Sequence, residues 1–198
     1  MARTPLHNRQ EALEKAMALF WRKGFHATSL KDLEGALDMR PGSIYAAFGS
    51  KDQLFLEALE CYAQRSLSEA DRIFAAHASP MQGLSAYLRN LGSIRDEALP
   101  CPACMLTKSL MELGDQEAKT RQRVEALLAG MEARFAEQLR AAQSAGELSA
   151  DEDIELLSRR LQSEVMGLRT FAQRDVATKD IRRMAEAIAD TWASLGRA

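Results

Sequence analysis

The stretch from Thr28 to Lys51, TSLKDLEGALDMRPGSIYAAFGSK, decides the fold of this chain. Thr28 and Ser29 are residue types that cap helix N-termini, because their hydroxyl oxygens accept hydrogen bonds from free backbone N–H groups. Three leucines then recur at the spacing of one helix face: Leu30, Leu33 and Leu37. The first half of the stretch therefore predicts a short helix with one apolar face.

The second half predicts another short helix after a tight turn. Asp38-Met39-Arg40 interrupts the leucine pattern, and Pro41 suits a first helical position, where its missing N–H costs nothing. Ile44 and Phe48 lie one turn apart on the inner face, and Gly49 ends the helix. Two short helices joined in this way are the outline of a helix-turn-helix, whose second helix enters the DNA major groove. The pattern by itself also fits any small helical bundle.

The residues in and around this stretch resemble the DNA-binding domain of the TetR family of transcriptional repressors. The match includes Ala16–Phe20, Gly24-Phe25, Gly42–Tyr45, Lys51 and Leu54, and covers roughly the first 60 residues. The resemblance implies a three-helix head that reads DNA, followed by a helical body that binds a ligand and a second copy of the chain.

The resemblance also assigns DNA contacts by position. Arg40, Gly42 and Ser43 are predicted to reach base edges, whereas Tyr45 and Lys51 are predicted to contact phosphates. Thr28 is predicted to contact a phosphate through its hydroxyl or through a backbone N–H at the helix start. The full set of predicted DNA-binding residues is Thr28, Arg40, Pro41, Gly42, Ser43, Tyr45 and Lys51. Arg3 and Arg9 are candidates to reach phosphates from an N-terminal arm, with a solvated tail as the alternative. Where the family often has an aromatic residue or His, this sequence has Ala46-Ala47, so the resemblance does not imply an operator sequence.

Composition fits a regulator that touches DNA at one end. The chain has 198 residues, 46% of them hydrophobic and 27% charged, with a net charge of −2. Residues 1–48 hold seven Lys/Arg and five Asp/Glu (7 − 5 = +2), which leaves a net charge of −4 for residues 49–198.

No apolar stretch is long enough to span a bilayer, and the N-terminus lacks a signal core, so we expect a cytoplasmic protein. Three cysteines are too few for a disulfide scaffold.

The rest of the chain predicts an all-α fold with about nine helices. Apolar residues recur at helical spacing, and no segment of any length alternates with the period of a strand. We expect a helix-turn-helix domain over residues 1–48 and a helical ligand-binding and dimerisation domain over residues 49–198. Residues 49–77 form the predicted connecting helix, about 40 Å long at 1.5 Å per residue. The resemblance implies that this helix transmits the ligand state to the head.

Two surfaces of the body carry further predictions. The helices predicted near 150–173 and 178–196 have apolar stripes, and the resemblance implies that they pair across a two-fold axis. The predicted dimerisation residues are Leu161, Val165, Gly167, Leu168, Met184, Ile188 and Trp192. The alternative is that both stripes are buried within one chain. The predicted ligand-binding or sensing residues are Tyr62, Tyr87, Phe135, Phe171, Cys101, Cys104 and Met105, several of which could instead be core.

The sharpest chemical feature of the body is Cys101-Pro-Ala-Cys104. Cys104-Met105-Leu106 with Glu112-Leu113 downstream resembles a segment of one TetR subgroup, which commonly has Gly where this chain has Ala103. Three interpretations stay open: Cys104 packs as a small side chain, it senses electrophiles or oxidants as a thiolate favoured by a helix N-terminus, or Cys101, Cys104 and Met105 bind a soft metal such as Cu(I). Cys61 is expected in the core.

The leading hypothesis is a homodimeric, ligand-responsive repressor that binds a palindromic DNA operator. An inducer, whether a small molecule, an electrophile or oxidant, or a soft metal, would release the operator by favouring a different spacing of the two heads. We expect no cofactor, no resident metal and no membrane partner. The alternatives are a helical redox enzyme that uses the two cysteines, which lacks the flanking βαβ pattern, and a helical dimerisation protein that no longer binds DNA.

Overall fold

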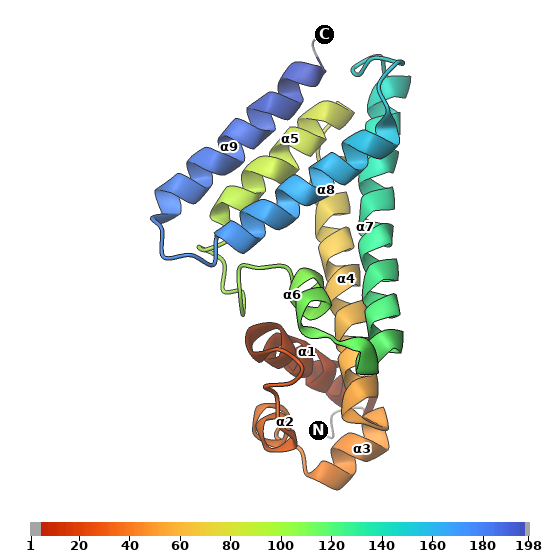
Figure 1. Ribbon diagram of the computed structural model, residues 1–198, viewed down its shortest axis with the longest axis vertical. Helices are drawn as coiled ribbons and strands as arrows, with labels where there is room; N and C mark the ends of the chain where they lie inside the picture. The colour runs from red at the N-terminus through yellow and green to blue at the C-terminus, as the bar shows by residue number, and fades with distance from the viewer. Residues whose placement is uncertain (1–4, 197–198) are drawn as a thin grey trace. The chain divides into compact units, whose positions relative to one another are not determined.

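The computed structural model describes residues 5–196, and these residues form an all-helical fold, which confirms the expected fold class (Figure 1). The described α-helices are α1 Pro5–Lys23, α2 Leu30–Leu37, α3 Pro41–Phe48, α4 Lys51–Ala75, α5 Pro80–Asn90, α6 Met105–Glu112, α7 Ala118–Ser144, α8 Ile154–Phe171 and α9 Thr178–Leu195. Short 3-10 turns cover Leu91–Ser93 and Asp115–Glu117. The segment around Pro100 and Pro102 is irregular, as two closely spaced prolines require.

The chain divides into two compact units. The first holds residues 1–65 and 105–127, and the second holds residues 66–104 and 128–198. The head therefore shares its unit with α6 and the beginning of α7, a division that differs from the boundary predicted between residues 48 and 49. Two long helices, α4 and α7, each contribute residues to both units.

The first unit is built on an aromatic core beneath the helix-turn-helix. The ring centroid of Phe55 lies 5.0 Å from that of Phe20 and 4.8 Å from that of Phe25. Leu33 of α2 and Ile44 of α3 are buried to 0% and 1% exposure, so both short helices turn their predicted apolar faces inward. Burial of these faces fixes α2 and α3 against α1 and α4, since hydrophobic contact is their main source of stability at this length.

The beginning and end of α2 are set by local hydrogen bonds. Ser29 is the N-cap: its hydroxyl accepts from the Asp32 N–H, and the Asp32 carboxylate accepts from the Ser29 N–H at 2.8 Å. Hydrogen bonds from Lys23, whose ammonium lies 2.8 Å from the carboxylate, and from Ser29 hold the pKa of Asp32 well below its usual range. Asp38 ends α2 in the left-handed conformation, with φ of 53°.

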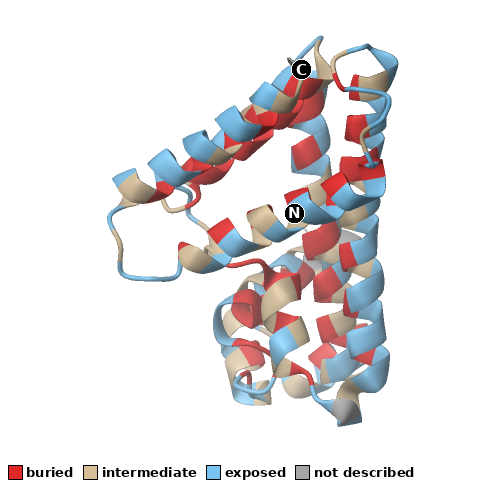
Figure 2. Ribbon diagram, turned by 45° about the horizontal axis from the view of Figure 1, so that its top comes forward, coloured by how far each residue is buried: buried red, intermediate tan, exposed pale blue. Residues whose placement is uncertain are grey.

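The second unit has its core where α5, α8 and α9 meet, with α5 and α9 side by side in Figure 1. Figure 2 shows the buried residues as stripes along the inner faces of these helices. Trp192 of α9 is fully buried, and its Nε1 donates to the Glu164 carboxylate of α8 at 2.6 Å. The guanidinium of Arg160 lies 5.3 Å from the centroid of the indole ring. This contact ties α8 to α9 inside one chain.

Candidate nucleic-acid interface and effector region

The exposed face of α3 has the geometry of a recognition helix. Arg40 precedes the helix in extended backbone, and its carbonyl accepts from the Ser43 N–H at 2.9 Å, which forms the first turn directly after Pro41. The side chains of Ser43 and Tyr45 point to solvent, and Tyr45 is 45% exposed. Tyr45 therefore presents its ring and hydroxyl on the exposed side of α3, opposite the buried Ile44 and Phe48.

Five of the seven residues predicted to bind DNA share this face or the turn before it: Arg40, Pro41, Gly42, Ser43 and Tyr45. Their contacts with DNA stay a prediction.

Thr28 does not fit its predicted role through its hydroxyl. The residue is fully buried, and its Oγ1 donates to the Gly24 carbonyl at 2.6 Å. The hydroxyl therefore donates its hydrogen bond within the turn between α1 and α2. Because it is buried there, it cannot reach a phosphate. Ser29 caps α2 in its place.

Lys51 lies at the first position of α4, partly buried. Its Nζ lies 4.3 Å from the ring centroid of Phe25, a cation–π contact. Partial burial lowers the pKa of Lys51, while Asp52, Glu112 and Asp32 oppose that shift through their negative charges. The ring of Phe25 holds the ammonium beside the head, and its contact with a phosphate stays a prediction.

Arg9 has a structural role rather than the arm-like one considered from the sequence. It lies in α1, donates through Nη2 to the Glu57 carboxylate at 2.7 Å and through Nε to the Ala47 carbonyl at 3.2 Å. Its guanidinium lies 4.5 Å from the ring centroid of Phe48. Arg9 therefore joins α1, α3 and α4 and fixes the angle of α3. Arg3 lies outside the described residues.

The seven predicted ligand-binding residues belong to different units. Tyr62 and Met105 are buried in the first unit, where the ring of Tyr62 packs edge-on against Trp21 at 4.9 Å. Cys101, Cys104, Tyr87, Phe135 and Phe171 belong to the second. There the ring centroid of Tyr87 lies 5.6 Å from that of Phe135, and burial raises the pKa of Tyr87 to about 12. The positive charge of Arg169 opposes that rise. A role in ligand binding stays a prediction for all seven residues.

Both cysteines of the Cys101-Pro-Ala-Cys104 segment are buried free thiols, at 8% and 3% exposure. The Gln173 side-chain amide donates to Cys101 Sγ at 2.6 Å. Arg95 donates through Nε to the Ala172 carbonyl at 2.8 Å and also reaches the Arg174 and Val176 carbonyls. These contacts attach the irregular segment before α6 to the C-terminal end of α8, where free carbonyls require donors.

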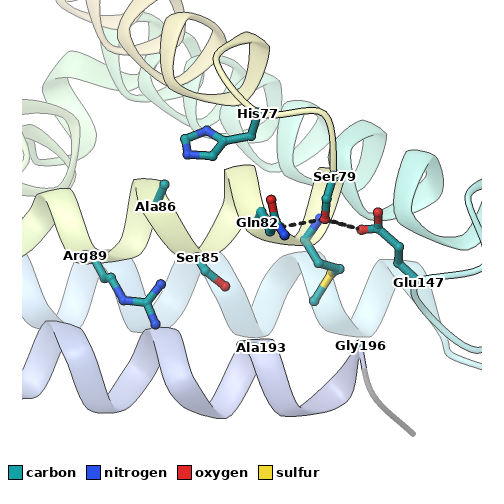
Figure 3. Close-up of a pocket in the computed structure, with 10 residues that line it drawn as sticks. His77, Ser79, Gln82, Ser85, Ala86, Arg89, Glu147, Ala193 and Gly196 are labelled. Atoms are coloured by element: carbon teal, nitrogen blue, oxygen red, sulfur yellow. Dashed lines mark hydrogen bonds between the residues drawn. The ribbon is translucent and has the colours of Figure 1, made fainter.

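The structure also has an open groove of about 820 Å³ beside α5 and the end of α9 (Figure 3). None of the seven predicted ligand residues lines it. Its charged groups are already paired: Glu147 accepts from Ser79 Oγ at 2.8 Å and from the Met81 N–H at 2.9 Å. Arg89 donates to Glu186 at 2.9 Å and to Asp190 at 2.8 Å.

The predicted dimerisation residues fall into two groups. Leu161, Val165, Leu168 and Trp192 are buried within the chain, at 0–4% exposure, which corrects the prediction that they contact a second copy. Gly167 and Met184 are exposed, and Ile188 is half-buried. The name outer face is used below for residues at helical spacing on these two helices: Leu156, Ser163 and Gly167 of α8, and Met184, Ala187, Ile188 and Thr191 of α9. All of them except the half-buried Ile188 are exposed.

The order and geometry of these elements define a helix-turn-helix regulator with an N-terminal reading head and a helical body. The family model described as "Bacterial regulatory proteins, tetR family" matches residues 12–58. The model "Tetracyclin repressor-like, C-terminal domain" matches residues 80–190, more than half of the chain. The chain belongs to the TetR family, as the resemblance implied.

Relatives match along nearly the whole chain. The HTH-type transcriptional repressor ComR of Escherichia coli is 24% identical over 194 residues, 98% of this chain and 92% of that protein. The uncharacterised HTH-type regulator YezE of Bacillus subtilis is 27% identical over 170 residues, 85% of this chain and 87% of that protein. Among solved structures, a cysteine mutant of the TetR family regulator CifR in complex with operator DNA matches with a TM-score of 0.85 and 27% identity, covering 96% of this chain and 100% of that chain.

Proposed function

We propose that the protein is a transcriptional repressor that binds a palindromic operator as a homodimer and leaves it when an inducer reacts at Cys104. The observation that carries the DNA-binding part is the two-sided character of α3: Ile44 and Phe48 are buried, whereas Ser43 and Tyr45 face solvent beside Arg40. The CifR structure, solved with operator DNA, supports this reading. In the part of the chain that the structure describes, no helix is long and apolar enough to cross a membrane. The proposed site of action is the cytoplasm.

Homodimerisation is proposed through the outer face. A palindrome read by two identical heads requires recognition helices about 34–36 Å apart, one turn of DNA. The outer face offers apolar side chains in water, with Leu156 63% exposed and Met184 36% exposed. Gly167 adds a position without a side chain, which permits close approach of another helix.

The proposed inducer is an electrophile or oxidant. Cys104 is a free thiol that directly precedes the first residue of α6, so a reagent that reacts with it acts at the start of that helix. The second thiol, Cys101, lies three residues before Cys104, and its sulfur accepts a hydrogen bond from the Gln173 side chain. Two CifR structures with operator DNA are of cysteine mutants, and they match this chain at 27% and 28% identity, which supports testing the thiols here.

The two kinds of DNA contact predict different results in a salt titration. For Lys51→Ala, we expect affinity to fall on all duplexes, with a slope of log affinity against log salt that is smaller by about one, because one phosphate contact is lost. For Arg40→Ala, we expect a relaxed preference at particular base pairs. Lys119→Ala, which removes an exposed lysine of α7, serves as the control and leaves both quantities unchanged. Equal weakening on every duplex for Arg40→Ala would show that Arg40 touches only phosphates.

A thiol substitution tests the inducer class. Cys104→Ser is expected to keep operator affinity within about twofold, since the two side chains are nearly isosteric, and to abolish release by a thiol reagent such as iodoacetamide. Cys61→Ser, which removes the half-buried thiol of α4, is the matched control and stays fully responsive. Measurement is by fluorescence anisotropy of labelled operator before and after treatment. Undiminished release from the Cys104→Ser protein would assign Cys104 to packing.

A further inference from the structure

The turn between α1 and α2 is closed by a carboxylate from a distant helix. The backbone N–H of His26 donates to Glu112 Oε1 at 2.6 Å, and the N–H of Phe25 donates to Glu112 Oε2 at 3.0 Å. Gly24 has φ of +88°, and a Cβ on that residue would lie 2.6 Å from Glu112 Oε2. The glycine is therefore required twice, by its left-handed backbone and by the approach of the carboxylate.

A second side chain on the same face of α6 holds the end of α1. Lys108 precedes Glu112 by four residues, so the two side chains lie one above the other on the helix. Lys108 Nζ donates to the Trp21 carbonyl at 2.7 Å and to the Arg22 carbonyl at 3.2 Å. Both carbonyls belong to the last turn of α1. Together, Lys108 and Glu112 fix α6 to both the end of α1 and the start of the helix-turn-helix.

The beginning of α6 coincides with a boundary of the two units. The chain passes from one unit to the other at residues 65/66, 104/105 and 127/128. The first and last of these crossings lie inside α4 and α7, where the helical hydrogen bonds continue through the boundary. Within residues 5–196, the crossing between Cys104 and Met105 differs from the other two because it does not lie inside a helix.

We propose that α6 is the relay between Cys104 and the head, with Glu112 as the positioning residue that holds the helix-turn-helix in its DNA-binding geometry. Because α6 has eight residues and follows Cys104 directly, a displacement at its first residue reaches Glu112 within about 12 Å of helix. Withdrawal of the carboxylate frees two backbone donors in the turn that sets the direction of α2, and α3 follows α2. The part of this proposal in which a reaction at Cys104 starts the movement depends on the proposed function. The two hydrogen bonds from the Phe25 and His26 amides to Glu112, here called the latch, do not depend on it.

The latch is tested without DNA by amide hydrogen exchange. Glu112→Gln keeps the shape of the side chain but presents an N–H₂ group to one of the two backbone donors. We expect the amides of Phe25 and His26 to exchange about 10- to 100-fold faster, the factor that corresponds to a lost hydrogen bond to a charged group. Operator affinity is expected to fall about tenfold. Glu60→Gln, which removes one exposed carboxylate of the same unit from its pair with Arg123, is the control and changes neither quantity.

Lys108→Met provides a second variant in which the carboxylate remains, should Glu112→Gln fail to fold. It is expected to speed exchange at the same two amides by a smaller factor. Exchange at Phe25 and His26 that stays as slow as in the unmodified protein in both variants would overturn the latch. If the unmodified protein does not bind DNA, the proposed function is overturned but the exchange result still stands. Failure of the proposed function and failure of the latch are therefore distinguishable.

The relay is tested with iodoacetamide, using the Cys61→Ser protein. The Cys104 thiolate displaces iodide from the reagent: an S–C bond forms, the C–I bond breaks, and the thiol proton passes to solvent. The added group enlarges a side chain that is 3% exposed, so the groups around it must move, and the start of α6 is the next residue of the chain. We expect the Phe25 and His26 amides to lose protection once mass spectrometry shows that Cys104 is alkylated. Retained protection after alkylation, or failure of Cys104 to react, would overturn the relay.

Discussion

Gly167→Glu is expected to convert the protein from a dimer to a monomer and to lower operator affinity by about 100- to 10,000-fold. The affinity falls because a monomer engages one half-site, whereas a dimer gains the effective concentration of its second head. Within a single chain nothing lies within 4 Å of a Cβ placed on Gly167, so the substitution has room and leaves the fold intact. At the proposed interface the same carboxylate meets a closely packed second copy and is desolvated.

Gly130→Glu is the matched control for this experiment. Gly130 is also an exposed glycine inside a long helix, with nothing within 4 Å of its Cβ position, but it lies on α7, outside the outer face. The control protein should remain dimeric and keep its operator affinity. Sedimentation velocity at micromolar concentration and a duplex titration measure the two quantities. A dimeric Gly167→Glu protein with undiminished affinity would remove the outer face from the proposal.

Trp192→Ala is expected to lower the free energy of unfolding by about 3–5 kcal/mol, the range for deleting a large buried aromatic side chain. Trp192 is fully buried between α8 and α9, and the truncation leaves a cavity and removes the donor to Glu164. Trp192→Phe retains most of the ring and is expected to cost less than half as much. Both are measured by urea denaturation in the monomeric Gly167→Glu background, where the stability does not depend on protein concentration.

This background separates a core role from an interface role. If Trp192 acted only at the interface, as the sequence first suggested, its removal would not change the stability of a protein that is already monomeric. A loss below about 1 kcal/mol in that background would therefore contradict the placement of Trp192 in the core.

The short helices of the head could be predicted because their signals are local. The spacing of Leu30, Leu33 and Leu37 and the position of Pro41 specify two helices within 20 residues, and the structure has α2 and α3 at those places. The choice between Thr28 and Ser29 as the cap was not predictable, since both hydroxyls can accept the same bond. It was decided by Gly24, whose carbonyl accepts from Thr28.

The roles of α8 and α9 were only half predictable. Helical periodicity identifies an apolar stripe, but it does not say whether the surface that covers the stripe belongs to the same chain. The sequence predicts that Leu161 and Trp192 contact a second copy, but both are buried within the chain, whereas Gly167 and Met184 are exposed on the outer face.

The contacts of Glu112 were beyond the reach of the sequence. The residue is separated by 86 and 87 positions from the two amides that it binds. A single carboxylate at the end of a short helix has the same local pattern as any solvated Glu. The resemblance of Glu112-Leu113 to a segment of one TetR subgroup draws attention to Glu112. It does not indicate that the carboxylate binds the amides of Phe25 and His26.

Selection of bound DNA from random duplexes tests the central claim most directly, that two copies of α3 enter successive turns of one major groove. The claim predicts a palindrome whose half-sites are centred about 10–10.5 base pairs apart, or a multiple of that spacing, with the preference weakened at particular positions for Arg40→Ala. Recovery of duplexes with no shared sequence, or of a single unpaired half-site, would contradict it.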